Sequence, residues 1–241
     1  MTTSGTSPRT PPPLEKGDRN LNPPGMSLLA LIAEDWRTHD RRWLAQGFWV
    51  LALHRFGNWR MSIRPKLLRA PFSLLYKMLY PFTEWVCGIK LSYNVQVGRR
   101  VRIEHFGGMI LGARSIGDDV IIRQNTTFGV ARTGHNTGKP IIEDRVDIGC
   151  GVAILGDVRI GHDSIIGANA VVVRDVPPCS IVVGVPGRVI RTRSAQEIAQ
   201  SLAQRGLPTP EPIAAQLATQ TPAPQPAPSS APPLPQESRQ S

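Results

Sequence analysis

The chain has 241 residues, three scattered cysteines and a formal net charge of +10, with 28 Lys and Arg against 18 Asp and Glu. The cysteines form no CxxC pair, so neither a disulfide framework nor a zinc knuckle is indicated. The sequence also has no compact run of Lys and Arg with interleaved aromatics, which argues against a nucleic-acid partner. The N-terminus lacks the apolar run of a secretory signal, and no later apolar stretch is long enough to span a membrane. We therefore expect a cytoplasmic, soluble protein with no transmembrane segment and no nucleic-acid partner, although it could touch a membrane surface.

The two ends of the chain are rich in proline and poor in large apolar residues. Residues 1–26 hold six of the 23 prolines, and ten more lie between Pro208 and Pro235. Such segments bury too little apolar surface to offset the entropy that ordering would cost. We expect residues 1–26 and 206–241 to be disordered tails.

Residues 27–91 are predicted to form a short α-helical N-terminal domain. Leu44, Phe48 and Leu51 recur at i, i+4 and i+7, which places them on one face of a helix. Three prolines follow, so we expect about two to four short helices rather than one long helix. These prolines are Pro65, Pro71 and Pro81. The segment carries ten Lys and Arg against four Asp and Glu, a basic balance that suits a phosphate-bearing cofactor or a solvated surface.

An aliphatic residue then recurs at every sixth position. The run consists of Ile142, Ile148, Ile154, Ile160, Ile166 and Val172. Neither the 3.6-residue period of a helix nor the two-residue period of a strand explains this spacing. It is typical of a coil whose short flat segments are joined by tight corners, each segment pointing one aliphatic side chain inward. Gly149, Gly161 and Gly167 follow three of the inward residues, where a corner favours a residue without a Cβ.

The same rhythm starts near Val97 and changes register once. Val97, Ile103 and Met109 are six residues apart. After a slip of one residue, the expected inward positions are Ile110, Ile116, Ile122 and Phe128. The hexapeptide pattern predicts a mainly β protein with a parallel β-helix over residues 92–190 and a short C-terminal helix over 191–205.

A polar, glycine-rich insertion over residues 132–139 interrupts the coil between Phe128 and Ile142. An insertion that leaves the coil and returns in register has to project outward. Loops on a rigid scaffold commonly carry substrate contacts, and a surface loop without function is the alternative.

His105 is the principal candidate for chemistry. It lies two residues after the inward Ile103 and just before Gly107 and Gly108, which let a ligand or another backbone approach closely. An imidazole can accept a proton from a hydroxyl group at neutral pH and return it. A histidine that only hydrogen-bonds a corner is the alternative, and the spacing alone leaves both open.

Other kinds of site find less support in the sequence. His105, His135 and His162 are far apart, with no closely spaced pair, so we expect no metal, and a zinc-dependent hydrase is a minor alternative. No G-x-S-x-G elbow, P-loop or dinucleotide fingerprint occurs. A non-catalytic scaffold is the third reading, suggested by the long tails.

Several motifs in a fixed order resemble those of the serine O-acetyltransferases, which belong to the hexapeptide-repeat (left-handed β-helix) acyltransferase superfamily. These motifs are Gly47-Phe48 followed by Arg55–Trp59, Ile103–Ile110, Ile122–Gly129, and Gly184–Arg188. The resemblance spans about 35–191 and implies a left-handed β-helix, homotrimeric assembly, and acetyl transfer from acetyl-CoA to a hydroxyl group. It places His105 at the family's general base. The implied contacts to acetyl-CoA are Gly129, Cys150, Ala168 and Arg188, with Arg191 as a further phosphate contact or a surface residue.

The chain departs from the family pattern around the acceptor. Glu104 replaces the aspartate beside the histidine, Lys90 stands where the family has the aspartate that orients it, and Asp40 is the candidate partner of an amino group. In the loop, Lys139 stands where a histidine would hold a carboxylate, with His135 nearby. The resemblance still favours L-serine as acceptor and hence cysteine biosynthesis, and a sugar or polysaccharide precursor in exopolysaccharide biosynthesis is the alternative.

The resemblance has one further implication, at the C-terminus. The chain ends in Gln240-Ser241 rather than in the isoleucine that docks into cysteine synthase. We therefore expect no complex with cysteine synthase.

Overall fold

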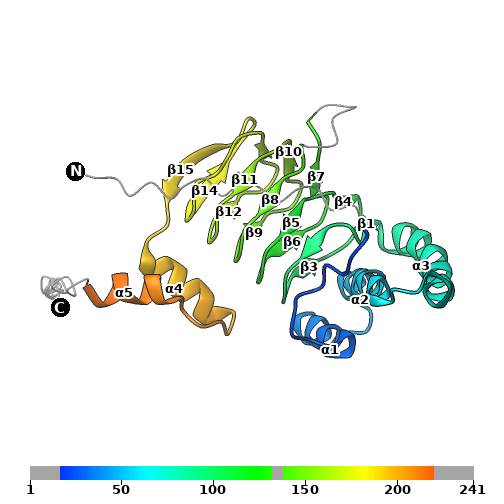
Figure 1. The fold of residues 1–241 in the computed structure, drawn as a ribbon. Helices are drawn as coiled ribbons and strands as arrows, with labels where there is room; N and C mark the ends of the chain where they lie inside the picture. The colour runs from blue at the N-terminus through cyan, green and yellow to red at the C-terminus, as the bar shows by residue number, and fades with distance from the viewer. Residues whose placement is uncertain (1–16, 132–137, 220–241) are drawn as a thin grey trace, which may run out of the picture. The chain divides into compact units, whose positions relative to one another are not determined.

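The computed structural model describes residues 17–131 and 138–219 (Figure 1). The chain divides into two compact units, of which the first ends at Ser194 and the second begins at Ala195. The disorder expected for the proline-rich ends concerns mainly residues 1–16 and 220–241, which lie outside the described residues. Every helix in the described parts of the chain is too short or too polar to traverse a lipid bilayer.

The N-terminal part of the first unit is helical, as the sequence indicates. Its elements are α1 (Leu28–Thr38), α2 (Gln46–Trp59), the 3-10 turn η1 (Arg60–Ser62) and α3 (Lys66–Cys87). The side chain of Ser27 caps α1 by accepting a hydrogen bond from the Ala30 N–H at 3.2 Å. Gly88 ends α3 in the left-handed conformation, with φ of 62°.

Helix α3 is longer than the sequence predicts. It runs for 22 residues through Pro71 and Pro81, so the expectation that these prolines would end a helix was wrong. Both prolines lie on the exposed side, whereas Tyr76, Thr83 and Cys87 on the other side are buried. This packing holds the helix together across the two backbone hydrogen bonds that proline cannot donate.

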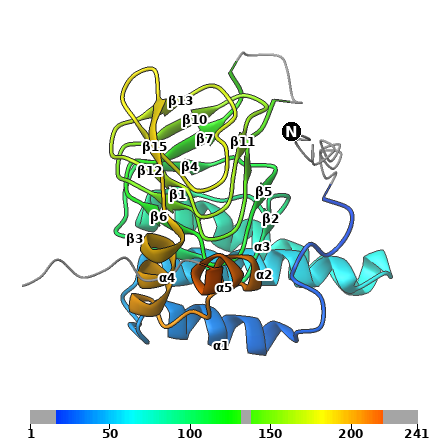
Figure 2. The same ribbon diagram turned by 90° about the vertical axis from the view of Figure 1, so that its left-hand side faces the viewer.

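Residues 89–183 form a parallel β-helix, confirming the fold class predicted from the hexads (Figures 1 and 2). Sheet A consists of β1 (Ile89–Lys90), β4 (Met109–Leu111), β7 (Thr127–Gly129), β10 (Ala153–Leu155) and β13 (Val171–Val172). Sheet B consists of β2 (Gln96–Val97), β5 (Ser115–Ile116), β8 (Ile141–Ile142) and β11 (Arg159–Ile160). Sheet C consists of β3 (Arg102–Glu104), β6 (Ile121–Arg123), β9 (Asp147–Ile148), β12 (Ile165–Ile166) and β14 (Ser180–Val183), with β15 (Arg188–Thr192) added antiparallel. Because the chain visits the sheets in the order A, B, C, the corners form three long edges, named here A–B, B–C and C–A.

The predicted inward residues line the interior. All six residues of the run from Ile142 to Val172 are at most 2 % exposed. Equivalent residues of neighbouring coils stack in register; Ile148, for example, pairs with Ile122 on one side and Ile166 on the other. Stacked aliphatic side chains give each coil a dry core shared with the next one, which is why a period of six residues specifies this fold.

The register slip lies within β4 and differs from the prediction. Met109 and Leu111 both point inward, whereas Ile110 is 49 % exposed, so its expected inward position was wrong. Leu111 pairs with the inward Phe128, and Ile110 pairs with Thr127. The pairing with Phe128 turns Leu111 inward, and because side chains alternate along a strand, the neighbouring Ile110 points outward.

The corners depend on close approach and on left-handed backbone. A Cβ on Gly149 would lie 2.6 Å from the Ala168 nitrogen, which explains why this corner takes glycine. Three residues after an inward position, Arg145, Asp163 and Asn169 adopt φ between 57° and 59° without being glycine. Asp and Asn tolerate this conformation better than most residues.

A buried hydrogen-bond network joins the helices to the first coils. Arg55 on α2 contacts both carboxylate oxygens of Asp35 on α1, at 3.0 and 3.3 Å. It also donates to the carbonyl oxygens of Val97 at 2.7 Å and Gly98 at 2.6 Å. The preceding residue, His54, bonds the Val95 carbonyl at 2.9 Å, and burial lowers the pKa of His54 to about 3.

The ordered chain extends beyond the predicted boundaries at both ends. Residues 17–26 precede α1, and the Leu21 N–H donates to the Asn58 side chain at 3.0 Å. In the second unit, α4 (Ala195–Gln204) occurs close to the expected C-terminal helix. Helix α5 (Glu211–Thr219) lies in the stretch expected to be disordered. Ile213 of α5 is buried despite the surrounding prolines, and α5 packs on α4.

Replacing His54 with glutamine should flatten the pH dependence of stability in mild acid. The folded chain keeps the ring neutral down to a pKa of about 3, whereas the unfolded chain protonates it near the ordinary value of 6.5. The contribution of the neutral ring is therefore complete above about pH 6.5 and falls by up to about 1.4 kcal/mol per pH unit as the pH drops toward about 3. Urea unfolding between neutral and mildly acidic pH should show this slope in the native sequence and less of it in His54→Gln.

His162→Gln is the matched control, because the hydrogen bond to Asp163 raises the pKa of His162. Its contribution has the opposite sign: it is present below the unfolded pKa and is lost as the pH rises through the folded pKa. Parallel profiles for the native protein and His54→Gln would show that His54 is not the source of the acid sensitivity.

Candidate active site

A cleft opens between strand β3 and the connection that joins α1 to α2. Its volume is about 300 Å³, and its lining includes His39, Asp40, Gly47, Glu104 and His105. The sequence singled out His105 as a candidate site residue, and the family resemblance added Asp40 and Glu104. The structure brings these three together.

His105 lies at the first residue after β3, on the C–A edge, and its side chain is exposed. Its φ is 64°, and the neighbouring Gly107 and Gly108 also have positive φ. A non-glycine residue held in this region carries a conformational cost, which His105 shares with the corner residues Arg145 and Asn169. Among residues 17–131 and 138–219, no hydrogen bond or ion pair engages the His105 ring. Lys90 instead forms an ion pair with Glu84 at 3.8 Å.

The wall of the cleft opposite β3 is positioned by a second, buried histidine that the sequence did not single out. His39 Nδ1 donates to the Asp35 carbonyl at 2.7 Å, and Nε2 accepts from the Ile103 N–H at 3.2 Å. Burial lowers the pKa of His39, which favours the neutral ring that this pairing requires. Gly47 permits the close packing, because a Cβ there would lie 2.8 Å from Ile103 Cβ. No sequence motif marks His39, whose role depends on two elements meeting.

The acidic groups of the cleft belong to a row of alternating charges across sheet C. Arg102 contacts Asp40 at 2.6 Å and Glu104 at 2.9 Å, and Arg123 contacts Glu104 at 3.3 Å and also pairs with Asp147. The hydrogen bond from Arg102 lowers the pKa of Asp40. Both carboxylates are therefore paired in the free protein. Arg102 and Glu104 are two residues apart on a strand, a spacing that places them on the same face and could have indicated this row.

The C–A edge carries two of the predicted acetyl-CoA contacts together with His105. The backbone of successive corners is joined by hydrogen bonds from Asn125 to Gly107 at 3.2 Å, from Gly151 to Gln124 at 2.9 Å, and from Asn169 to Cys150 at 2.8 Å. Cys150 and Ala168 occupy two of these corners. The edge therefore forms a continuous line from the corner of His105 to that of Ala168.

Other predicted residues lie elsewhere. Gly129 ends β7 at the A–B edge, with open space where a Cβ would point. Lys139 lies at the same edge, two residues before β8 begins. Arg188 and Arg191 lie on the exposed strand β15. His135 falls in residues 132–137, outside the described part of the chain.

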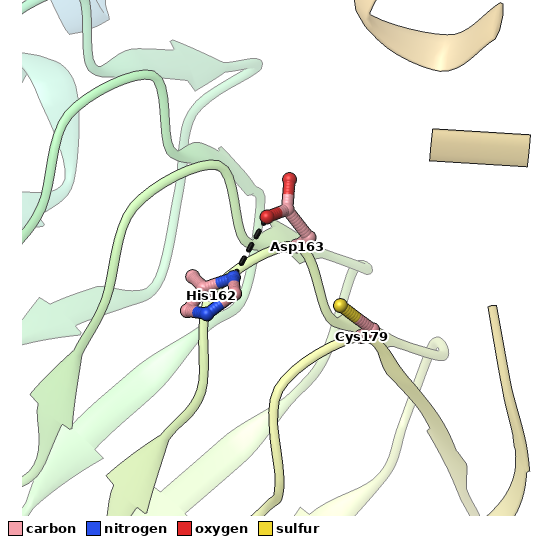
Figure 3. A group of neighbouring side chains, drawn as sticks. All are labelled: His162, Asp163 and Cys179. Atoms are coloured by element: carbon pink, nitrogen blue, oxygen red, sulfur yellow. Dashed lines mark hydrogen bonds and ion pairs between the residues drawn. The ribbon is translucent and has the colours of Figure 1, made fainter. Parts of the chain in front are cut away.

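Away from the cleft, at the B–C edge, three side chains among the described residues are grouped as potential metal ligands. The ligand atoms of His162, Asp163 and Cys179 lie within 4.8 Å of one another (Figure 3). The Asp163 carboxylate, however, pairs with Arg145 at 2.8 Å and with His162 at 2.8 Å. A guanidinium on the same carboxylate disfavours a cation, so we regard the group as an ion-pair cluster. His162 and His105 lie on different edges, which does not support the zinc alternative.

Known proteins support the resemblance. No protein-family model matches the chain. A serine acetyltransferase of Mycobacterium tuberculosis is 40% identical over 138 residues, which cover 57% of this chain and 57% of that protein. The chain thus matches little more than half the length of this relative. A serine acetyltransferase of Staphylococcus xylosus is 36% identical over 155 residues, which cover 63% of this chain and 70% of that protein.

Solved structures lead to the same group. The chain is similar to the soybean serine acetyltransferase apoenzyme, with 29% identity, a TM-score of 0.58, and coverage of 68% of this chain and 69% of that chain. The soybean serine acetyltransferase complexed with serine is also 29% identical, with a TM-score of 0.57 and coverage of 68% and 70%. With the Staphylococcus xylosus relative matched over more than two thirds of its length, the chain belongs to the serine acetyltransferase family.

Proposed function

We propose that this chain transfers an acetyl group from acetyl-CoA to the hydroxyl group of L-serine, the reaction that opens a route to cysteine, with His105 as the general base. The observation that carries the proposal is the position of His105. Its exposed ring lies at the cleft between β3 and the α1–α2 connection, on the edge that also holds Cys150 and Ala168. An acceptor in the cleft and a thioester along the edge would both reach this ring.

The chemistry follows from the imidazole. His105 removes the proton of the acceptor hydroxyl as its oxygen attacks the thioester carbonyl carbon. The tetrahedral intermediate then collapses, the carbon–sulfur bond breaks, and His105 returns the proton to the departing thiolate. Backbone N–H groups at the corners are suited to stabilise the oxyanion. These steps require no metal.

The charges of the cleft suit an amino acid that carries both an ammonium group and a carboxylate. The ammonium group would approach Glu104 and Asp40, where it competes with Arg102 for the carboxylate oxygens. The acceptor carboxylate would pair with Lys139, and His135 is a second candidate from the same loop. For acetyl-CoA, the chain offers Cys150 and Ala168 along the C–A edge, Gly129 at the A–B edge, and Arg188 for a phosphate.

A homotrimer would complete this site. His105 lies on the C–A edge and Lys139 at the A–B edge, so sheet A separates the two within one chain. Packing the C–A edge of one copy against the A–B edge of the next brings the two residues to the same side of a shared groove. Such head-to-tail contacts close into a ring of three when each copy is rotated by a third of a turn from the last. The expected absence of a cysteine synthase complex rests on Gln240 and Ser241, outside the described residues, and stays a prediction.

A panel of acceptors tests the substrate. Purified protein with labelled acetyl-CoA should transfer the label to L-serine and release coenzyme A, while homoserine and nucleotide sugars should stay unlabelled. Label on a sugar alone would show that the acceptor is a sugar, as in exopolysaccharide biosynthesis, and not serine. Release of coenzyme A without any labelled acceptor, or no release at all, would contradict the transferase assignment for this panel.

His105→Ala tests the base. Turnover should fall by roughly 10²–10⁴-fold, because a positioned general base contributes about that much, while the affinity for acetyl-CoA measured by calorimetry should change little. Trp85→Phe, distant in sequence and exposed on α3, is the control for handling and folding. Turnover within a few-fold of the native protein would remove His105 from the mechanism.

Mixing two inactive variants tests the shared site. His105→Ala and Lys139→Ala should each be poorly active, but unfolding and refolding them together should restore about a quarter of the sites, because a head-to-tail contact can then combine both native residues. Refolding each variant alone is the control. Absence of recovery in mixed oligomers of confirmed composition would place both residues in the same copy.

A further inference from the structure

Helix α3 has an apolar face that no other element covers among the described residues of the first unit. Exposed apolar side chains recur along it with the period of a helix. They are Leu67, Leu68, Leu74, Leu75, Met78, Leu79, Phe82, Trp85 and Val86. We call these nine residues the α3 apolar face. In Figure 1, α3 lies at the margin of the first unit, with α2 on its inner side. Two of the largest side chains, Met78 and Trp85, are 69 % and 85 % exposed.

The α3 apolar face continues into a groove beside α2. This groove has a volume of about 640 Å³, and nearly all its lining residues are apolar, including Trp43, Trp49, Leu79 and Phe82. Trp43 and Leu44, in the connection before α2, are themselves exposed. Monomeric soluble proteins rarely expose continuous apolar surface of this kind unless it binds something.

The charges around the face are almost all positive. Residues 60–90 contain six Lys and Arg and one acid, Glu84. Glu84 lies near Lys90, with 3.8 Å between the charged atoms. Lys66 and Lys77 are exposed on α3 itself, and Arg64 is exposed just before it. An apolar stripe with Trp, Phe and Leu, bordered by Lys and Arg, is typical of a helix that lies in the plane of a membrane interface.

We propose that the α3 apolar face docks on the surface of a bilayer that contains anionic phospholipids. Helix α3 would lie flat, with its leucines and aromatic rings among the upper acyl chains and with Lys66 and Lys77 against the phosphates. The basic groups then meet opposite charges and the apolar side chains leave water. The helix rests on the membrane without crossing it, since α3, although 22 residues long, is not apolar enough to span a bilayer.

A second copy of the chain is a less suitable occupant. Lys77 lies near the middle of α3, so two antiparallel α3 helices would bring two lysines together. The only acid on the helix, Glu84, already lies beside Lys90. Like charges at such a contact oppose association, whereas anionic phosphates remove the conflict.

Vesicle co-sedimentation of the full chain tests the proposal. The protein should sediment with vesicles of phosphatidylcholine mixed with phosphatidylglycerol, and much less with phosphatidylcholine alone. The double variant Leu74→Glu, Met78→Glu should lower partitioning into the anionic vesicles by about tenfold or more, because it places negative charge among the acyl chains. The double variant Lys66→Gln, Lys77→Gln should lower binding to the anionic vesicles by about tenfold and flatten its dependence on salt.

Leu29→Glu is the matched control, since Leu29 is 77 % exposed on α1 and lies outside the α3 apolar face; its partitioning should equal that of the native chain. Circular dichroism confirms that each variant is folded. No sedimentation of the native chain with anionic vesicles, or equal sedimentation with both kinds, would overturn the proposal. The proposal would also be overturned if the native chain self-associated without binding vesicles and the double variant Leu74→Glu, Met78→Glu abolished that self-association. The occupant of the face would then be a second copy.

Discussion

The buried guanidinium of Arg55 is the interaction on which the rest of the structure depends. It joins the carboxylate of Asp35 on α1 to the carbonyl oxygens of Val97 and Gly98 in the first coil. A buried charge that loses its partners costs several kcal/mol, so the group is tolerated only when both helices and the coil are assembled. The α1–α2 connection is thereby held against β3, with His39 completing the contact. The cleft exists because this connection cannot move away.

Two groups on the β3 side of the cleft, Glu104 and His105, differ in how firmly the structure holds them. On sheet C, Glu104 is fixed between Arg102 and Arg123 in a row of charges. His105 projects from a corner with a left-handed backbone and has no hydrogen-bond partner among the described residues. A general base has to exchange protons with two different partners, so an imidazole without a fixed partner suits that role. In the proposed reaction, the ammonium group of the acceptor would displace part of the interaction between these carboxylates and Arg102.

Much of the fold could be predicted because its information is local and repeated. Each hexad specifies one inward side chain, and stacking repeats the same choice in every coil. Local rules failed where packing decided: Ile110 was expected inward but its pairing with Thr127 sends it outward, and α3 continues through Pro71 and Pro81 because its other side is buried. Of the site, the sequence and the resemblance singled out His105, Glu104 and Asp40. Neither indicated that Arg102 pairs with Asp40, since partners 62 residues apart leave no local pattern.

The sequence by itself therefore determined the coil, the helical segment before it and the histidine that follows one inward position. These features follow from periodicity and residue type, which act over a few residues. Only the tertiary structure decided which groups face one another: the pairing of Asp40 with Arg102, the neutral His39 behind the cleft, and the separation of His105 from Lys139 on two edges of one sheet. Contacts between residues distant in sequence depend on the register and packing of whole coils, and these are set by the summed burial of many side chains rather than by any single motif.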